Sequence, residues 1–365
     1  MADKTKIEWS DATWNPITGC TLVDEGCRYC YAAHLITSWP AIGNHPSRKG
    51  LARKNAAGDS KFTGEVRFNE QWLYQPLRWK KPRRTFVCAH GDLFHESVPD
   101  EWIDRVFAVM ALAPHHTFQV LTKRPDRAAQ YLADMVIRID AIQDWADEIL
   151  GSNDMPFTPH WPLPNVWLGT SISDQASADL RIPPLLECLA AVRFVSAEPL
   201  LGPVDLTRVR APEEWGPNPD GWVFDAFETG DFYTLFGDGP SLPSDGPYRD
   251  SAIDWVICGG ESGPHARPMH PDWARSLRDQ CVAAGVPFLF KQWGEWAEGS
   301  GFKKTAKIVL NNGRVFASTV DVQDPQDRAD WTSLAPCLMR PEGKRAAGRL
   351  LDDVEWSQFP GVANA

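Results

Sequence analysis

A repeated alternation of short apolar runs and amphipathic stretches is the feature that most constrains the fold of this chain. The runs are rich in Val, Phe, Ile and Trp, and each ends in polar residues or glycine. This alternation is typical of parallel strands joined by helices. Strands are predicted at residues 85–90, 117–123, 165–171, 192–198, 254–261 and 286–292, and helices at 99–113, 125–149, 175–190 and 271–284.

These six strands, with one more leading into the first cysteines, predict an α/β fold. We expect a partial or complete parallel (βα) barrel of the TIM type, with insertions and a small C-terminal appendage; a flat doubly wound sheet is the alternative. Residues 1–296 are assigned to the barrel and 297–365 to the appendage, where KIVLNNGRVFAS predicts a hairpin. Two stretches interrupt the barrel pattern: a basic insertion at 36–84 and an acidic, Gly- and Pro-rich insertion at 207–250.

Local signals mark both ends of the helix predicted at residues 271–284. Pro271 and Asp272 stand in its first turn, where a fixed backbone angle and a negative charge both favour a helix. Gly285 follows the last residues of the pattern, and glycine readily adopts the left-handed conformation that ends many helices. We therefore expect the helix to end at Gly285.

The chain has the composition of a globular protein. Of its 365 residues, 43% are hydrophobic and 23% are charged, which is enough apolar material for one large core. Its apolar runs stay below the roughly 18 residues that span a bilayer, and its first residues lack the apolar stretch of a secretory signal. We expect a cytoplasmic protein.

Three of the eight cysteines lie close together near the N-terminus. Six residues separate Cys20 from Cys27 and two separate Cys27 from Cys30, so their thiolates can converge on one site. In a reducing compartment, such a group binds a metal more often than it forms disulfides. The other five cysteines stand alone in or beside apolar segments and are expected to be small buried side chains: Cys88, Cys188, Cys258, Cys281 and Cys337.

The metal at this site depends on the fourth ligand. His34 stands four residues after Cys30 and would complete a structural zinc site of three cysteines and one histidine. A four-iron cluster held by three cysteines instead leaves one iron open to a small molecule. The spacing alone favours neither.

Polar side chains follow most of the predicted strands at the C-terminal end, where βα barrels carry their reactive groups. They are Asp92, Lys123, Arg124, Ser171, Glu198, Glu261, Lys291 and Gln292. So many polar groups after apolar strands predict a site at this end of the barrel. The cations Lys123, Arg124 and Lys291, with Gln292 beside the last of them, predict contact with an anionic substrate.

The insertion at 36–84 is basic although the net charge of the chain is −11. From Arg48 to Arg84 it has eleven Lys or Arg residues against three acids. Aromatic residues that can stack on bases lie between them: Phe62, Phe68, Trp72, Tyr74 and Trp79. A nucleic acid or nucleotide is the predicted substrate, with a peptide or small molecule as the alternative.

Several motifs resemble those of a known family. The cysteine loop, with Tyr29 directly before Cys30, resembles the radical S-adenosylmethionine (SAM) superfamily, whose usual pattern has three residues between the first two cysteines where this chain has six. Other motifs are similar to those of the phage- and bacterium-associated three-cysteine-motif family: WNPITGC, GDLFHE, VLTKRP, WLGTSI, SAEPLLGP, GGESGPHARPMH, FKQWGEW and GKRAAGRLLD. The resemblance covers most of the chain apart from the two insertions.

This resemblance implies a radical SAM enzyme in which Cys20, Cys27 and Cys30 hold a [4Fe-4S] cluster. One electron from a flavodoxin- or ferredoxin-like donor cleaves SAM to methionine and a 5′-deoxyadenosyl radical, which takes a hydrogen atom from the substrate. The alternative is a zinc-stabilised nucleic-acid-binding or regulatory module without radical chemistry.

The resemblance also implies which residues bind SAM: Tyr29, Asp92, Ser171, Glu198, Gly259, Gly260 and Glu261. Asp92 would receive the SAM amine, and Tyr29 would help to form the adenine slot. Ser171 and Glu198 would meet the ribose or the methionyl part. The two glycines would let the backbone approach the cofactor closely.

Overall fold

The computed structural model of the chain describes residues 5–151, 160–215, 222–229, 232–234, 251–299, 305–317 and 334–361. Parts of the predicted insertion at 207–250 and of the predicted appendage at 297–365 lie outside these residues. Within the described ranges, every helix is too short or too polar to cross a membrane.

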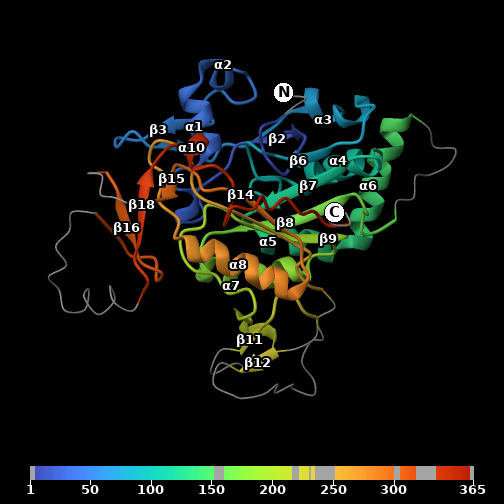
Figure 1. The fold of residues 1–365 in the computed structure, drawn as a ribbon. Coiled ribbons are helices and arrows are strands. Elements are labelled where there is room, and N and C mark those ends of the chain that lie inside the picture. The colour runs from blue at the N-terminus through green and yellow to red at the C-terminus, as the bar shows by residue number, and fades with distance from the viewer. Residues whose placement is uncertain are drawn as a thin grey trace. The chain divides into compact units, whose positions relative to one another are not determined.

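Seven strands form one parallel sheet, and they follow one another in chain order (Figure 1). They are β1 (Ala12–Trp14), β6 (Arg84–Val87), β7 (Thr117–Thr122), β8 (Val166–Ile172), β9 (Val192–Ala197), β13 (Trp255–Gly259) and β14 (Phe288–Gln292). In the register, Thr85 lies between Ala12 of β1 and Phe118 of β7. A doubly wound sheet reverses its strand order at one point, and this sheet does not. The fold is therefore a partial (βα) barrel, as predicted.

All six predicted strands are present, and the predicted helices are present with one difference. The helices around the sheet are α4 (Asp100–Ala111), α5 (Pro125–Ala133), α6 (Met135–Leu150), α7 (Gln175–Glu187) and α8 (Pro271–Ala284). The single helix predicted at 125–149 was wrong, because Asp134 has φ −85° and ψ 32° and divides it into α5 and α6. Helix α6 packs on α4 (Figure 1).

The strands are buried along most of their length, as expected for a parallel sheet covered on both faces. All residues of β13 are buried, and Trp255 and Phe118 are among the largest side chains with no contact to solvent. All eight cysteines are free thiols. Four of the five isolated cysteines are buried as predicted, and Cys337 is half-buried.

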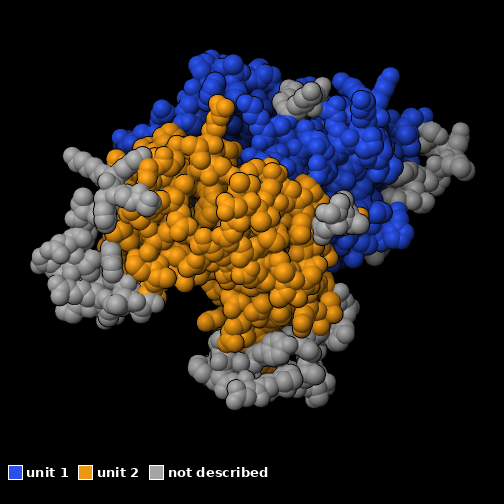
Figure 2. Space-filling model, viewed as in Figure 1, with its two compact units in different colours: residues 1–171, 181–194 blue, residues 172–180, 195–365 orange. Residues whose placement is uncertain are grey.

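The chain divides into two compact units, which Figure 2 colours separately. The first comprises residues 1–171 and 181–194 and contains the cysteine loop and the basic insertion. Helix α1 (Tyr31–Ser38) leads into the insertion, which is more regular than predicted and carries short elements: α2 (Pro40–Gly43), β3 (Ala52–Lys54), β4 (Ser60–Phe62), β5 (Arg67–Phe68), α3 (Glu70–Leu73) and η2 (Pro76–Arg78). Strands β3 and β4 form a hairpin, and β5 pairs with β2 (Ile17–Thr18).

The second unit comprises residues 172–180 and 195–365. Besides its part of the parallel sheet it carries antiparallel strands: β10 (Val209–Arg210), β11 (Trp222–Phe224), β12 (Phe232–Thr234), β15 (Trp296–Glu298), β16 (Lys307–Val309), β17 (Val315–Ala317) and β18 (Cys337–Pro341). The short helices η3 (Glu213–Trp215) and α10 (Lys344–Ala347) complete it. Strands β16 and β17 form the predicted hairpin. The predicted domain boundary at residue 296 stays a prediction.

The segment after α10 runs along β14, the last strand of the parallel sheet. Phe290 donates its backbone N–H to the carbonyl of Trp356 at 3.0 Å, and Gln358 donates to the carbonyl of Phe288 at 3.2 Å. The ring of Phe359 lies 5.2 Å from that of Trp255. This segment therefore covers the hydrogen-bonding edge of β14.

A candidate cysteine-lined cofactor site

Three thiols open into one cavity of the first unit, with a volume of about 140 Å³. Cys20, Cys27 and Cys30 all line this cavity and are half-buried. The structure thus brings together the three side chains that the spacing predicted to converge. In the described parts of the chain, no three His, Cys, Asp or Glu side chains are placed so that they could hold a metal ion as they stand.

Backbone hydrogen bonds shape the loop that carries these cysteines. The N–H of Gly19 donates to the carbonyl of His90 at 3.0 Å and ties the start of the loop to the segment after β6. Asp24 caps the short helix η1 (Glu25–Cys27) by accepting the N–H of Cys27 at 3.1 Å. Cys30 directly precedes α1, so its thiol lies at a helix N-terminus, where the helix dipole favours a thiolate.

The thiols influence one another electrostatically, which agrees with their shared cavity. Burial raises the pKa of Cys20 to about 12, with contributions from Asp92 and Cys30, whereas Arg124 lowers it. Burial also raises the pKa of Cys30, against backbone hydrogen bonds from Ala32 and Ala33 that lower it. A group that binds these sulfurs as thiolates has to compensate for this burial.

Asp24 joins the cysteine loop to two cations. Its carboxylate accepts hydrogen bonds from Lys123 Nζ at 3.1 and 3.2 Å and forms an ion pair of 2.5 Å with Arg181. Arg181 is 2% exposed and also donates to the carbonyl of Ser171 at 2.8 Å. Burial raises the pKa of Asp24, but Lys123 and Arg181 outweigh it and lower that pKa to about 2.

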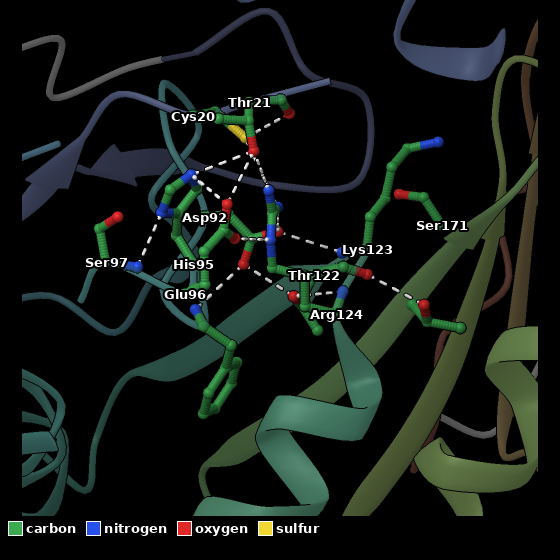
Figure 3. Close-up of polar contacts among 12 residues, drawn as sticks. Cys20, Thr21, Asp92, His95, Glu96, Ser97, Thr122, Lys123, Arg124 and Ser171 are labelled. Carbon is green, nitrogen blue, oxygen red and sulfur yellow. Dashed lines mark hydrogen bonds and ion pairs between the residues drawn. The ribbon is translucent and has the colours of Figure 1, made fainter. Parts of the chain in front are cut away.

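Asp92 lines the cavity, and both of its carboxylate oxygens are occupied by donors of the chain (Figure 3). Oδ1 accepts from Thr122 Oγ1 at 2.7 Å and from the N–H of Phe94 at 3.0 Å. Oδ2 accepts from the N–H of Lys123 at 3.2 Å and from Arg124 Nη1 at 3.0 Å. The predicted contact with the SAM amine would add to these hydrogen bonds or replace one of them.

The site also contains polar residues that sequence reasoning missed. His95 is 1% exposed and accepts the N–H of Ser97 on Nδ1, so its Nε2 carries the proton and faces Thr21 Oγ1 at 3.1 Å. Burial and the charge of Arg124 lower the pKa of His95. The signal was the segment GDLFHE, in which Glu96 also reaches Arg124 at 2.7 Å.

Three other predicted residues differ in their relation to the cavity. Ser171 lines it. Tyr29 is not among the lining residues, and Arg28 lies 5.5 Å from its ring centre; Tyr31 lines the cavity instead and donates its hydroxyl to Ala89 at 2.7 Å. His34, the predicted zinc ligand, is also absent from the lining, and its Nδ1 lies 3.4 Å from Ser38 Oγ.

A fourth cysteine, Cys88, lines the same cavity, although the sequence predicted only a small buried side chain there. It lies directly after β6 with φ 57°, an uncommon backbone angle for a residue with a side chain. Burial and the charge of Asp92 raise its pKa to about 12, while a hydrogen bond from the backbone of Ile17 lowers it. It is thus buried, as predicted, and also adjoins the site.

The basic insertion contributes a wall of the cavity through Ser60, Lys61 and Phe62 of the hairpin. Most of its predicted stacking residues already pack within the protein. The ring of Phe68 stacks on Trp102 at 5.2 Å, and that of Trp72 stacks on His45 at 5.1 Å. Trp79 is 8% exposed.

In the second unit, the predicted residues form a cluster of their own. Lys291 Nζ contacts both carboxylate oxygens of Glu198, at 2.6 and 2.9 Å. A Cβ atom on Gly259 would lie 3.4 Å from Lys291 Cβ and 3.5 Å from Glu198 Cδ, which is ordinary van der Waals contact, so the pair lies directly beside Gly259. Lys123 and Arg124 also bind carboxylates, so all three cations predicted to meet an anionic substrate are paired with an acid of the chain.

Glu261 and its neighbours are also held by local contacts. Arg267 binds Glu261 through its side chain at 2.7 and 2.8 Å and through its backbone N–H at 2.8 Å. A Cβ atom on Gly260 would lie 2.0 Å from the carbonyl oxygen of Trp293, so only glycine permits this close approach of two loops. Gln292 is buried and donates to the carbonyl of Gly260 at 3.5 Å.

Comparison with known proteins adds one finding. The model of a protein family described as "Protein of unknown function (DUF5131)" matches residues 4–360, a range that covers the cysteine loop and every strand of the parallel sheet. Neither the curated proteins nor the solved structures contain a match.

Proposed function

Because the chain belongs to the DUF5131 family of unknown function, we propose an activity from its own site: a radical SAM enzyme whose Cys20, Cys27 and Cys30 hold a [4Fe-4S] cluster. The observation that carries this proposal is that the three thiols, seven and three positions apart in the sequence, line one cavity. Thiolates are the usual ligands of iron–sulfur clusters.

The residues around the cavity do not include the histidine of the alternative zinc site. A structural zinc needs a fourth protein ligand; His34 does not line the cavity, so a zinc site here would have to use Cys88, the fourth thiol that lines it. Polar groups suited to a small polar ligand line it instead, among them Asp92, Thr122 and Ser171. Three thiolates are the protein ligands expected of a [4Fe-4S] cluster whose fourth iron binds SAM.

When bound, the cluster and SAM supply one-electron cleavage of SAM, which yields methionine and a 5′-deoxyadenosyl group that takes a hydrogen atom from the substrate. The chain's own part is to hold the loop and exclude water. Asp24 fixes the loop between Cys20 and Cys27 through Lys123 and Arg181. Phe62 and Phe86 supply apolar surface to the same cavity.

The proposed substrate is anionic, with a nucleic acid as the first candidate. Exposed cations of the basic insertion support it, because Lys49, Arg53 and Lys54 lie on or beside the hairpin that forms a wall of the cavity. Arg48 does not support it, since it is 8% exposed and donates to His90 at 2.9 Å. The electron would come from a flavodoxin- or ferredoxin-like donor, in the cytoplasm, where thiols stay reduced.

Anaerobic purification tests the cluster. A brown protein with about four irons, which forms 5′-deoxyadenosine from SAM on reduction, is the expected result. The variant Cys27→Ala is expected to lose the iron. The matched control is Cys88→Ala, which changes another cysteine of the same cavity and is expected to keep it. A colourless protein with one zinc would reject the proposal.

The substrate class is tested by salt-dependent binding. We expect the wild type to bind RNA or DNA at low salt, and the affinity to fall as salt rises. Replacing Lys49, Arg53 and Lys54 together by Ala is expected to weaken binding at least tenfold. Replacing Lys80 and Lys81, which are exposed elsewhere in the basic segment, is the control. Absence of measurable binding at low salt would exclude nucleic acid as the substrate.

A further inference from the structure

We propose that Arg124 is a positioning residue for Cys20 and sets the electrostatic environment of the Cys20 sulfur, rather than binding the substrate. This inference rests on the proposed function, because it concerns Cys20 as a ligand of the cluster. Arg124 lies between β7 and α5, where its backbone N–H donates to Thr122 Oγ1 at 2.9 Å. The residue is 9% exposed.

Four contacts fix the guanidinium group of Arg124 (Figure 3). Nε donates to Glu96 at 2.7 Å, and Nη1 donates to Asp92 at 3.0 Å. Nη2 donates to Oγ1 of Thr21, the residue next to Cys20, at 2.5 Å. Arginine has five N–H donors in a rigid fork, so these contacts define both the position and the plane of the group.

The fourth contact is to sulfur. Nη1 also lies 3.7 Å from Cys20 Sγ, which makes Arg124 a hydrogen-bond donor to a proposed cluster ligand. Arg124 thus stands in contact with both Cys20 and the carboxylate of Asp92. If the cation were removed, a thiolate at Cys20 would face the negative charge of Asp92 without compensation.

The charge at Arg124 should therefore favour the reduced form of a bound cluster. Reduction adds one negative charge, and hydrogen bonds to the sulfurs and nearby cations stabilise that charge. The same contacts leave the guanidinium group little freedom to reach a substrate. Arg124 belongs to the surroundings of the proposed cluster.

The test is redox titration of the iron-loaded protein, in which the optical or electron paramagnetic resonance spectrum reports the fraction of reduced cluster. Arg124→Gln removes the charge, and we expect its equilibrium constant for one-electron reduction to fall at least tenfold, or about 59 mV toward more negative potential. Arg124→Lys keeps the charge but not the fork, and an intermediate shift is expected. Arg127→Gln is the matched control, because Arg127 lies on α5, binds Asp100 and does not line the cavity.

The outcomes separate the two proposals. A wild-type protein that takes up no iron overturns the proposed function and this inference together. If the wild type holds iron and the equilibrium constant for one-electron reduction of Arg124→Gln stays within threefold of the wild-type value, this inference alone is overturned. If Arg124→Gln folds, by circular dichroism and thermal unfolding, but holds no iron while Arg127→Gln does, the positioning role is supported.

Discussion

At the scale of single residues, His90 is expected to make the stability of the folded protein depend on pH. It is half-buried, and Arg48 donates to its Nδ1 at 2.9 Å, so burial and that cation lower its pKa to about 3. The unfolded chain binds a proton on this residue below pH ~6.5 and the folded chain does not. We expect His90 to make the folded state lose stability as pH falls from about 6.5 toward 3, by at most about 1.4 kcal/mol per pH unit.

The variant His90→Gln isolates this effect, since glutamine can accept from Arg48 but does not titrate. Urea unfolding between pH 7.5 and 4.5 should show that the stability of the variant rises relative to the wild type as pH falls. Parallel curves for the two proteins would contradict a half-buried His90 that stays neutral in the folded protein.

A second residue-scale prediction concerns Asp24. Replacing it by Asn leaves Lys123 and the buried Arg181 without their carboxylate, and we expect a loss of about 2 kcal/mol in the free energy of unfolding. Glu25→Gln is the matched control, because the neighbouring acid forms an exposed pair with Arg28, and its replacement should change stability by less than about 0.5 kcal/mol. Equal effects of the two substitutions in urea unfolding would contradict the stabilising role of the contacts that Asp24 makes with Lys123 and Arg181.

At the scale of elements, the end of α8 follows its sequence. Gly285 has φ 67°, and Val286 donates its N–H back to the carbonyl of Cys281, as predicted for a glycine-ended helix. A Cβ atom at this position would meet nothing within 4 Å, so the cost of a side chain comes from the backbone angle alone. Gly285→Ala should lower the unfolding free energy by about 1 kcal/mol, and Gly285→Asn by less, because asparagine tolerates the angle. Thermal unfolding measures both.

Elements with a strong local pattern could be predicted, and those that depend on distant contacts could not. The break between α5 and α6 at Asp134 carries no glycine or proline, so nothing local marked it. The pairing of β2 with β5 joins residues about fifty positions apart. The basic insertion was read as irregular for the same reason, because its short strands are stabilised by pairing rather than by periodicity.

At the scale of the whole molecule, the segment 355–361 protects the end of the parallel sheet. Deleting residues 355–365 would expose the hydrogen-bonding edge of β14, and exposed edges of apolar strands promote association between molecules. We expect this truncation to lower the melting temperature and to produce soluble aggregates in size-exclusion chromatography. Deleting only residues 362–365 is the control, and aggregation of both variants alike would contradict the protective role.

The parallel strands were predictable from apolar runs that alternate with helices, but their order was not, because the same alternation also fits a doubly wound sheet. The convergence of Cys20, Cys27 and Cys30 on one cavity was predictable from spacing. The partners of the polar strand ends were not: no local pattern shows that Lys291 meets Glu198, or that Arg124 meets Asp92 and Glu96. Ion pairs over such separations are a product of the fold and leave no trace in any one segment.

The contacts of Asp24 with Lys123 and Arg181 have a consequence for how the length of the cysteine loop can vary among related proteins. The six residues between Cys20 and Cys27 include the acid that neutralises Lys123 and Arg181, which lie about 100 and 160 positions further along the chain. A related chain with a shorter loop that lacks this acid would leave Lys123 and the buried Arg181 without their carboxylate partner. Loop length and these distant positions should therefore change together during evolution, so that homologues with three residues between the first two cysteines lack at least one of the two cations.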